Sequence, residues 1–339
     1  MSSGQRFQSL NRPRETQSWL AGWIFGLVAI SPVSLAPTFA RADDGISILQ
    51  RMAQATQQLS YSGVFVYQNG KRMETSRITH VVMDGSDRER VEVLDGSPRE
   101  ILRNGEEIQS FLPDENRLIV ETRSIRQRFP ALVPAGLVSL PEHYRIRRSG
   151  YGRVAGIDSR VLILEPRDDL RYGRQFWIDM NSGLLLRSRI VDPQGDTLES
   201  FSFTQLTIGD PLNADVLKPG FDRNQVRVQR ITATETTPES QGWVFQNTVP
   251  GFRRIVALKR EADDGRPASL QVLFSDGVAS MSAFIEPRPA GKADATVLTS
   301  RGSVSVYHRQ VRDHMVVVMG EVPAQAVKQL GDGVAWKAQ

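Results

Sequence analysis

The feature that most constrains the fold of this chain is a series of Asn-Gly and Asp-Gly pairs in its first third. Four such pairs separate short runs rich in β-branched and aromatic residues, at Asn69-Gly70, Asp84-Gly85, Asp95-Gly96 and Asn104-Gly105. Both central residues of a type I′ turn have a positive φ, which Asn, Asp and Gly tolerate best, so each pair predicts a β-hairpin. The sequence therefore predicts an antiparallel meander.

The β-like runs continue well beyond these turns. They cover residues 64–68, 72–83, 88–94, 100–103, 107–112, 117–121, 144–149, 159–164, 174–179, 184–191 and 197–208. A sheet of so many twisted antiparallel strands tends to curl into a barrel or half-barrel, and its concave face can hold an apolar ligand. A helical period over residues 46–59 predicts one amphipathic helix ahead of the strands.

A composition shift divides the chain. Residues 224–241 are rich in Thr, Gln, Arg and Glu without a clear period, which is typical of a linker. A second β-rich unit follows, with strands expected at 255–260, 269–274, 280–285, 303–309 and 314–319 and a short helix at 324–330. We expect a mainly β fold with packed helices (α+β). Its large domain, 43–223, is expected to be an antiparallel barrel or half-barrel, and its smaller C-terminal β-rich domain covers 242–339.

The first 42 residues have the three parts of a cleavable export signal. Arg6, Arg12 and Arg14 precede an apolar run of 12 residues, Trp19–Ile30, and Ala40-Arg41-Ala42 fits the small-residue cleavage rule. The run is shorter than the ~20 apolar residues that span a membrane, which disfavours the alternative of an uncleaved anchor. We expect cleavage after Ala42, with Ala40 as the alternative, and export to a periplasm.

The charge and cysteine content of the chain bear on two questions, whether it binds nucleic acid and whether disulfides stabilise it. The chain carries 42 Lys and Arg against 38 Asp and Glu, but four of the arginines and only Glu15 lie in the predicted signal. The mature chain is thus nearly neutral, which gives no electrostatic argument for nucleic acid. No cysteine is present, so the fold rests on its hydrophobic core without disulfides.

A proline-rich apolar stretch interrupts the strands at Phe129–Leu140, and arginines flank it on both sides. It either lines the concave face or plugs its own domain as an apolar loop. On the first reading we expect an apolar ligand at Phe65, Phe111, Phe129, Leu132, Val133, Leu137 and Trp177. Basic groups beside an apolar cavity suit an anionic headgroup, for which Arg126, Arg128 and Arg145 are the candidates. The alternative for these arginines is solvated loop ends and a polar strand face.

Motifs for catalysis or metal binding are weak. Gly150–Ala155 matches a dinucleotide fingerprint, but the flanking strands look antiparallel, so we interpret it as a turn. The four histidines lack metal-ligand spacing, and the paired aspartates sit at predicted turns and helix ends. We expect no metal, no cofactor and no enzymatic activity. An unrecognised enzyme would be tested at Asp168, Asp169 and His143.

Short segments in both units together resemble the MucB/RseB family. They are Tyr61–Gln68, Phe129–Pro134, Glu142–Tyr144, Arg171–Gly173, Phe176–Asp179, Ser182–Leu186, Gly242-Trp243, Pro250–Phe252, Phe274–Ser280 and Met319–Pro323. Each motif alone is short, but their order spans the whole mature chain.

The resemblance implies a periplasmic negative regulator of the envelope-stress sigma factor. It also implies that the large domain is like that of the lipoprotein carriers LolA and LolB, an open antiparallel half-barrel closed by helices. It further implies binding to the periplasmic part of an RseA/MucA-type anti-sigma factor, protection of that partner from site-1 proteolysis, and release on binding lipid or lipopolysaccharide. Under this reading we expect Trp243, Phe252, Phe274 and Phe284 of the small domain to hold the partner. The alternative function is a periplasmic lipid or lipoprotein carrier, and self-association into a homo-oligomer is left open.

Overall fold

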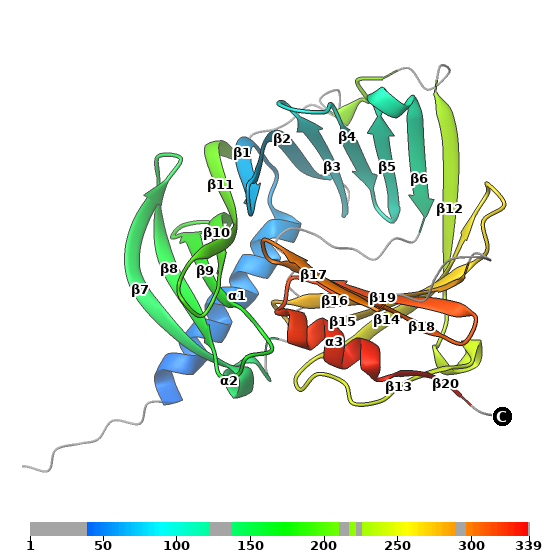
Figure 1. The fold of residues 1–339 in the computed structure, drawn as a ribbon. Coiled ribbons are helices and arrows are strands. Elements are labelled where there is room, and N and C mark those ends of the chain that lie inside the picture. Colours follow the sequence, from blue (N-terminus) through cyan, green and yellow to red (C-terminus); the bar gives the residue numbers. More distant parts are fainter. Residues whose placement is uncertain are drawn as a thin grey trace, which may run out of the picture. The chain divides into compact units, whose positions relative to one another are not determined.

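The structure, a computed structural model, describes residues 39–83, 85–122, 137, 139–209, 217–221, 226–288 and 296–337. Most of the predicted export signal, residues 1–38, lies outside the described residues. The described chain is mostly β with few helices, as the sequence predicts (Figure 1). In this part of the chain, no helix combines the length and apolar composition needed to cross a membrane.

In the described ranges, three α-helices accompany the strands. They are α1 (Phe39–Gln58), α2 (Leu140–His143) and α3 (Ala324–Asp332). Among the 3-10 turns of the described residues are Pro113–Glu115 and Glu239–Gln241. The predicted C-terminal helix runs through Gly331 and ends at Asp332, two residues later than predicted, with Gly333 as its C-cap.

The strands of the first two thirds of the chain follow the predicted runs, except that the strand predicted at 144–149 continues to Val154. They are β1 (Tyr61–Asn69), β2 (Arg72–Met83), β3 (Ser86–Val93), β4 (Glu100–Asn104), β5 (Glu107–Leu112), β6 (Arg117–Thr122), β7 (Tyr144–Val154), β8 (Ile157–Pro166), β9 (Gly173–Asp179), β10 (Leu185–Val191) and β11 (Thr197–Ile208). Most of Gly150–Ala155, which the sequence predicts as a turn, therefore belongs to a strand, and the turn follows at Ala155-Gly156.

All four predicted turn glycines, Gly70, Gly85, Gly96 and Gly105, have a positive φ. The residues before three of them, Asn69, Asp95 and Asn104, do not, so the prediction of type I′ turns at these pairs is wrong. Asn69 pairs with Arg72 and Asn104 pairs with Glu107, which places the two-residue loops one position later, at Gly70-Lys71 and Gly105-Glu106.

The remaining strands are β12 (Arg227–Glu235), β13 (Trp243–Phe245), β14 (Arg253–Ala262), β15 (Ser269–Ser275), β16 (Ser280–Pro287), β17 (Val297–Arg301), β18 (Val304–Val311), β19 (His314–Gly320) and β20 (Val334–Trp336). They include four short or polar ones that the sequence pattern does not indicate, β12, β13, β17 and β20. Strands β13 and β20 pair with each other, apart from the main sheet.

Eighteen strands of the described chain form one continuous, open sheet. Its order is β7-β8-β9-β10-β11-β1-β2-β3-β4-β5-β6-β12-β14-β15-β16-β19-β18-β17. The ladders are antiparallel except that between β6 and β12, which is parallel.

Strand β12 lies inside the stretch that its composition marks as a linker. Its first half, Arg227–Thr232, pairs with β6, and its second half, Ile231–Glu235, pairs with β14. Most of its side chains are partly or fully exposed, which explains why no hydrophobic period is visible. The connection between the two predicted domains is therefore a shared strand within the sheet.

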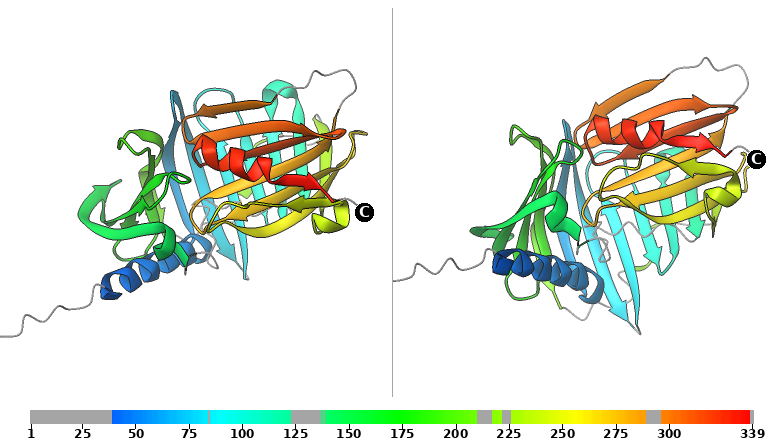
Figure 2. Two further views of the ribbon diagram at one scale, coloured as in Figure 1. Left: turned by 60° about the horizontal axis from the view of Figure 1, so that its bottom comes forward. Right: turned by 90° about the horizontal axis from the view of Figure 1, so that it is seen from below.

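Each region has its own hydrophobic core. Helix α1 packs its Leu49 and Met52 on strands β7–β10, around Leu162, Leu164 and Phe176. Helix α3 packs its Ala326, Val327 and Leu330 on the face of the C-terminal strands formed by residues such as Val272, Ala283 and Val318. Figure 2 shows these two helices, α1 in blue against green strands and α3 in red against orange and yellow strands. The alternating burial of the strands follows from these one-sided contacts.

Candidate functional site

An apolar cavity of about 190 Å³ lies beside strands β1 and β11. Its lining consists mainly of aromatic and aliphatic side chains: Thr56, Tyr61, Phe65, Tyr67, Ile78, Glu89, Val91, Leu184, Leu185, Phe201 and Phe203. The register of the two strands gathers the aromatic rings, because Phe65 is the cross-strand partner of Phe203. The ring centroids of Phe65 and Phe201 lie 4.9 Å apart.

One glycine makes room for this aromatic cluster. A Cβ on Gly63 would lie 2.4 Å from the backbone oxygen of Gln205 and 2.9 Å from the ring of Phe203. The motif Tyr61-Ser62-Gly63 therefore allows β1 and β11 to approach closely beside the cavity. Chemically, the cavity offers dispersion contacts and few polar groups, which suits an alkyl chain.

A second cavity, of about 410 Å³, shares Tyr67 with the first. It is lined by Tyr67, Asn69, Arg72, Glu74, Arg99, Thr299, Arg301, Val304 and Val306. The lining comes from the β1–β2 hairpin, the segment before β4, and the β17–β18 hairpin. Three arginines and one glutamate make this cavity net positive.

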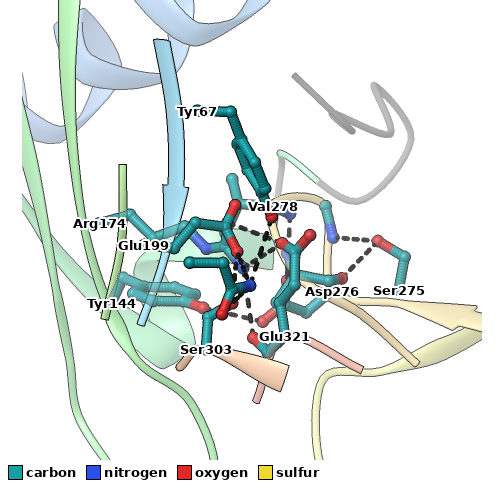
Figure 3. Close-up of polar contacts among 12 residues, drawn as sticks. Tyr67, Tyr144, Arg174, Glu199, Ser275, Asp276, Val278, Ser303 and Glu321 are labelled. Atoms are coloured by element: carbon teal, nitrogen blue, oxygen red, sulfur yellow. Dashed lines mark hydrogen bonds and ion pairs between the residues drawn. The ribbon is translucent and has the colours of Figure 1, made fainter. Parts of the chain in front are cut away.

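A buried ion pair joins the loop between β8 and β9 to the turn between β15 and β16. The side chains of Arg171 and Asp276 are both fully buried, and Arg171 Nη1 donates to Asp276 Oδ2 at 3.0 Å. Tyr144 donates its hydroxyl to the same oxygen at 3.1 Å, and Figure 3 shows these two side chains pointing toward each other. Burial, followed by the charge of Asp276, raises the pKa of Tyr144 well above its ordinary value.

The surroundings of this pair satisfy its remaining polar atoms. Arg171 donates to Asp168 Oδ1 at 3.0 Å and to the carbonyl of Pro250 at 2.6 Å, and its guanidinium lies over the ring of Phe252. The backbone amides of Val278 and Ala279 donate to Asp276 Oδ1. A pair so fully hydrogen-bonded fixes the relative position of its two loops.

A second polar cluster lies between β11, the β1–β2 turn and the β17–β18 turn (Figure 3). Glu199 accepts hydrogen bonds from Ser303 and, at 3.1 Å, from Asn69. Arg174 contacts Glu321 at 3.3 Å. Burial, and then the nearby charge of Glu321, raises the pKa of Glu199 to about 7, so this carboxyl titrates near neutral pH.

The predicted ligand residues fall in several places. Phe65 lines the apolar cavity, and Leu137 is fully buried in the core cluster under α1. Phe111 stacks on Phe221 with ring centroids 4.1 Å apart, and Trp177 lies under the guanidinium groups of Arg187 and Arg189. Neither Phe111 nor Trp177 lines the apolar cavity. Phe129, Leu132 and Val133 lie outside the described residues.

The predicted headgroup and partner residues are also dispersed. Arg145 is exposed on β7, whereas Arg126 and Arg128 lie outside the described residues. Trp243, Phe252 and Phe274 are buried in the core of the small domain, and Phe284 is partly exposed on β16. The structure gives the first three a packing role, and partner binding through any of the four stays a prediction.

The residues named for an unrecognised enzyme have structural partners. Asp168 accepts hydrogen bonds from Arg171 and from the amide of Leu170. Asp169 is exposed, and His143 lies against Gly251. Within the described ranges, no group of three or more His, Cys, Asp and Glu side chains is arranged to hold a metal ion.

The sequence reasoning missed most of the cavity lining. Phe201 and Phe203 alternate on β11 and could have been found by pairing that strand with β1. No local pattern indicates the arginine cavity, because Arg72, Arg99 and Arg301 come from separate segments. The same holds for Arg171 and Asp276, which are 105 residues apart in sequence.

Comparison with known proteins matches both regions of the chain. A model of the MucB/RseB N-terminal domain matches residues 44–221, and a model of the MucB/RseB C-terminal domain matches residues 237–335. The sigma factor AlgU regulatory protein MucB of Pseudomonas aeruginosa is 31% identical over 295 residues, which cover 85% of this chain and 90% of that protein.

Solved structures agree with the sequence matches. The complex structure of Pseudomonas aeruginosa MucA/MucB matches with a TM-score of 0.68 at 29% identity and covers 87% of this chain and 100% of the matched chain. A crystal structure of MucB in complex with MucA(peri) matches with a TM-score of 0.66 at 30% identity, with the same coverage. Both regions of this chain, and the order in which they occur, are thus shared with these proteins.

Proposed function

Because this chain belongs to the MucB/RseB family, we propose that it is a periplasmic negative regulator of an envelope-stress sigma factor. It binds the periplasmic part of an RseA/MucA-type anti-sigma factor and shields that segment from site-1 proteolysis. The observation that carries the proposal is the match over nearly nine tenths of the chain to a MucB solved in complex with MucA(peri). A predicted signal peptide in residues 1–42 supports export to the periplasm.

Protection follows from steric exclusion. A protease must bind an extended substrate segment on both sides of the bond that it cleaves, so a segment held against this protein is not a substrate. The sheet connects the two domains through β12, and the ion pair of Arg171 and Asp276 fixes two loops against each other. These contacts support a preorganised surface, which lowers the entropic cost of holding the partner.

Release is proposed to follow from lipid binding in the large domain. The strands β7–β11 and β1–β6 correspond in this proposal to the open half-barrel of LolA/LolB-type carriers, with the aromatic cavity as the acyl-chain site. That cavity is lined by Tyr61, Phe65, Phe201 and Phe203. Burial of each CH₂ contributes ~0.8 kcal/mol, so two buried methylenes exceed the ~1.4 kcal/mol that changes an affinity tenfold.

Thermodynamic linkage requires that lipid binding and partner binding weaken each other. A lipid that binds the free protein better than the complex weakens partner binding by the same factor, and the partner weakens lipid binding equally. The cavity and the partner surface need not overlap for this coupling. It requires only that the two ligands favour different arrangements of the protein.

The direct test is retention of the periplasmic segment of an RseA/MucA-type anti-sigma factor by the immobilised mature chain. We expect retention, and weaker retention when lipid is added. If the folded protein does not retain the segment, the proposed function is wrong.

The apolar cavity also favours a second candidate, a periplasmic lipid or lipoprotein carrier. A carrier transfers lipid between vesicles without protecting an anti-sigma segment. The small C-terminal domain argues for the regulator, since transport in an open half-barrel needs only the large domain. Vesicle-to-vesicle transfer by the mature chain, with no retention of the anti-sigma segment, would establish the carrier instead.

A further inference from the structure

The arginine-lined cavity beside Tyr67 has no role in the contacts described so far. It has a volume of about 410 Å³ and draws its lining from two hairpins and the segment before β4. We propose that this cavity is a subsite for an anionic headgroup of the phosphate class, carried by the amphiphile whose alkyl chain occupies the aromatic cavity. This inference deepens the proposed lipid response and rests on it.

The charges of the cavity are not balanced. Glu74 pairs with Arg72 at 3.3 Å and with Arg99 at 3.0 Å, so one carboxylate serves two guanidinium groups. Arg301 is exposed at the end of β17 and adds a third positive charge to the lining. An anion that enters the cavity therefore meets a net positive field, which is partly sheltered from screening by the cavity walls.

One donor in the cavity lining is unsatisfied. The Nε atom of Arg99 is buried and has no hydrogen-bond partner. A buried donor without a partner costs free energy, which an acceptor oxygen at that position recovers. Guanidinium groups bind phosphate and carboxylate oxygens through paired N–H donors, and the planar fork of Arg99 has one such donor left over.

Tyr67 connects the headgroup subsite to the alkyl site. Its side chain lines both cavities, and Figure 3 shows it directed toward Glu199. Burial, and then the charge of Glu199, raises the pKa of Tyr67, so its phenol stays protonated and remains a hydrogen-bond donor. An amphiphile can thus place its chain among Phe65 and Phe201 and its anionic group beyond Tyr67.

The residues that line the arginine cavity come from both domains, so a bound headgroup would contact both. Arg72 and Arg99 belong to the large domain, whereas Thr299, Arg301 and Val306 belong to the small one. An anion bound between Arg99 and Arg301 therefore contacts both at once. A neutral amphiphile would fill only the aromatic cavity and leave the β17–β18 hairpin without a new contact.

Calorimetric titration of the mature chain tests the inference with three probes. Decyl phosphate carries both parts, decyl maltoside has the same chain with a neutral headgroup, and inorganic pyrophosphate is a free anion. The alkyl probes are used below their micelle-forming concentrations. The variants are Arg301→Gln and the double variant Arg99→Gln/Arg301→Gln, and Arg145→Gln on β7 is the matched control for loss of an exposed arginine.

We expect decyl phosphate to bind the unaltered chain at least tenfold more tightly than decyl maltoside. Arg301→Gln lowers the decyl phosphate affinity about tenfold, the double variant abolishes the preference, and Arg145→Gln changes neither. Equal affinity of the unaltered chain for the two alkyl probes overturns the subsite. A decyl phosphate affinity that Arg301→Gln leaves unchanged, a preference that survives in the double variant, or a preference that disappears in Arg145→Gln also overturns it.

The pyrophosphate arm separates a lipid headgroup from a free anion. Pyrophosphate that binds as tightly as decyl phosphate, and loses affinity in Arg301→Gln, supports the anionic site but overturns its assignment to a lipid. If neither alkyl probe binds, the proposed lipid response fails. In that case pyrophosphate binding that depends on Arg301 still supports an anion site, and its absence overturns that as well.

Discussion

Removal of the Asp276 carboxylate tests the buried ion pair that joins the two domains. In Asp276→Ala, the guanidinium of Arg171 loses its fully buried counter-ion at 3.0 Å, and the hydroxyl of Tyr144 loses its acceptor at 3.1 Å. The amides of Val278 and Ala279 lose their acceptor as well. Arg171 keeps Asp168 and the carbonyl of Pro250, so its charge is only partly compensated.

The expected loss of stability is large because both partners are fully buried. Removing one member of a buried pair costs about 3–5 kcal/mol, most of it from the charge that stays behind. Equilibrium unfolding in urea of the mature chain, followed by tryptophan fluorescence, measures this value. Asp264→Ala is the matched control, because Asp264 lies in an exposed turn and pairs with Arg266 at the surface.

The double variant Arg171→Met/Asp276→Ala shows how much of the lost stability comes from the unpaired charge of Arg171 and how much from loss of the ion pair itself. If the leftover charge is the main cost, the double variant is more stable than Asp276→Ala alone. A loss below about 1 kcal/mol in Asp276→Ala, or a double variant that is less stable than either single one, would refute the reasoning.

Three further predictions concern the second cluster and the cavity. Because burial holds the pKa of Glu199 at about 7 against 4.5 for the free side chain, the folded chain binds this proton more tightly. Stability therefore falls as pH rises from 4.5 to 7, by up to about 3 kcal/mol; urea unfolding at a series of pH values measures the slope, which Glu199→Gln flattens. Gly302→Ala loses at least ~1 kcal/mol in the same assay, because its φ is +58° and a Cβ would lie 2.7 Å from the backbone nitrogen of Gly70. Phe65→Asp lowers the affinity for decyl maltoside more than tenfold in calorimetry, while Tyr151→Asp at a 74% exposed site leaves it unchanged; equal effects would contradict the cavity assignment.

The turn chemistry explains why the large sheet was predictable. The turns require a positive φ at Gly70 and Gly105, which glycine adopts most easily, and this local requirement does not depend on the rest of the fold. The hairpins β1–β2 and β4–β5 form where they were predicted, although each loop lies one residue later than the Asn-Gly pair, at Gly70-Lys71 and Gly105-Glu106. The mainly β fold with few helices was therefore accessible from local sequence alone.

Strand β12 could not be predicted from the local sequence pattern. Its polar residues carry no alternation, since the strand is held by backbone hydrogen bonds to β6 on one side and β14 on the other. Pairing between distant segments supplies the stabilisation that the side chains do not indicate. The composition of this stretch therefore resembles that of a linker although it forms a strand.

The candidate site was only partly predictable for the same reason. Phe65 was expected among the apolar residues of the ligand site on the concave face, and it lines the aromatic cavity. Arg301 lies more than 200 residues beyond Arg72 and Arg99, and only the folded chain places them around one cavity. The expected headgroup residue Arg145 sits on β7, outside that lining.

The central claim is that this protein protects an anti-sigma factor and that lipid withdraws the protection. The most direct measurement is the rate at which a DegS/AlgW-type protease cleaves the periplasmic anti-sigma segment, with and without the mature chain, and then with added decyl phosphate. We expect slow cleavage of the segment when the protein is present and restored cleavage when decyl phosphate is added. Cleavage at the same rate with and without the protein would contradict the central claim.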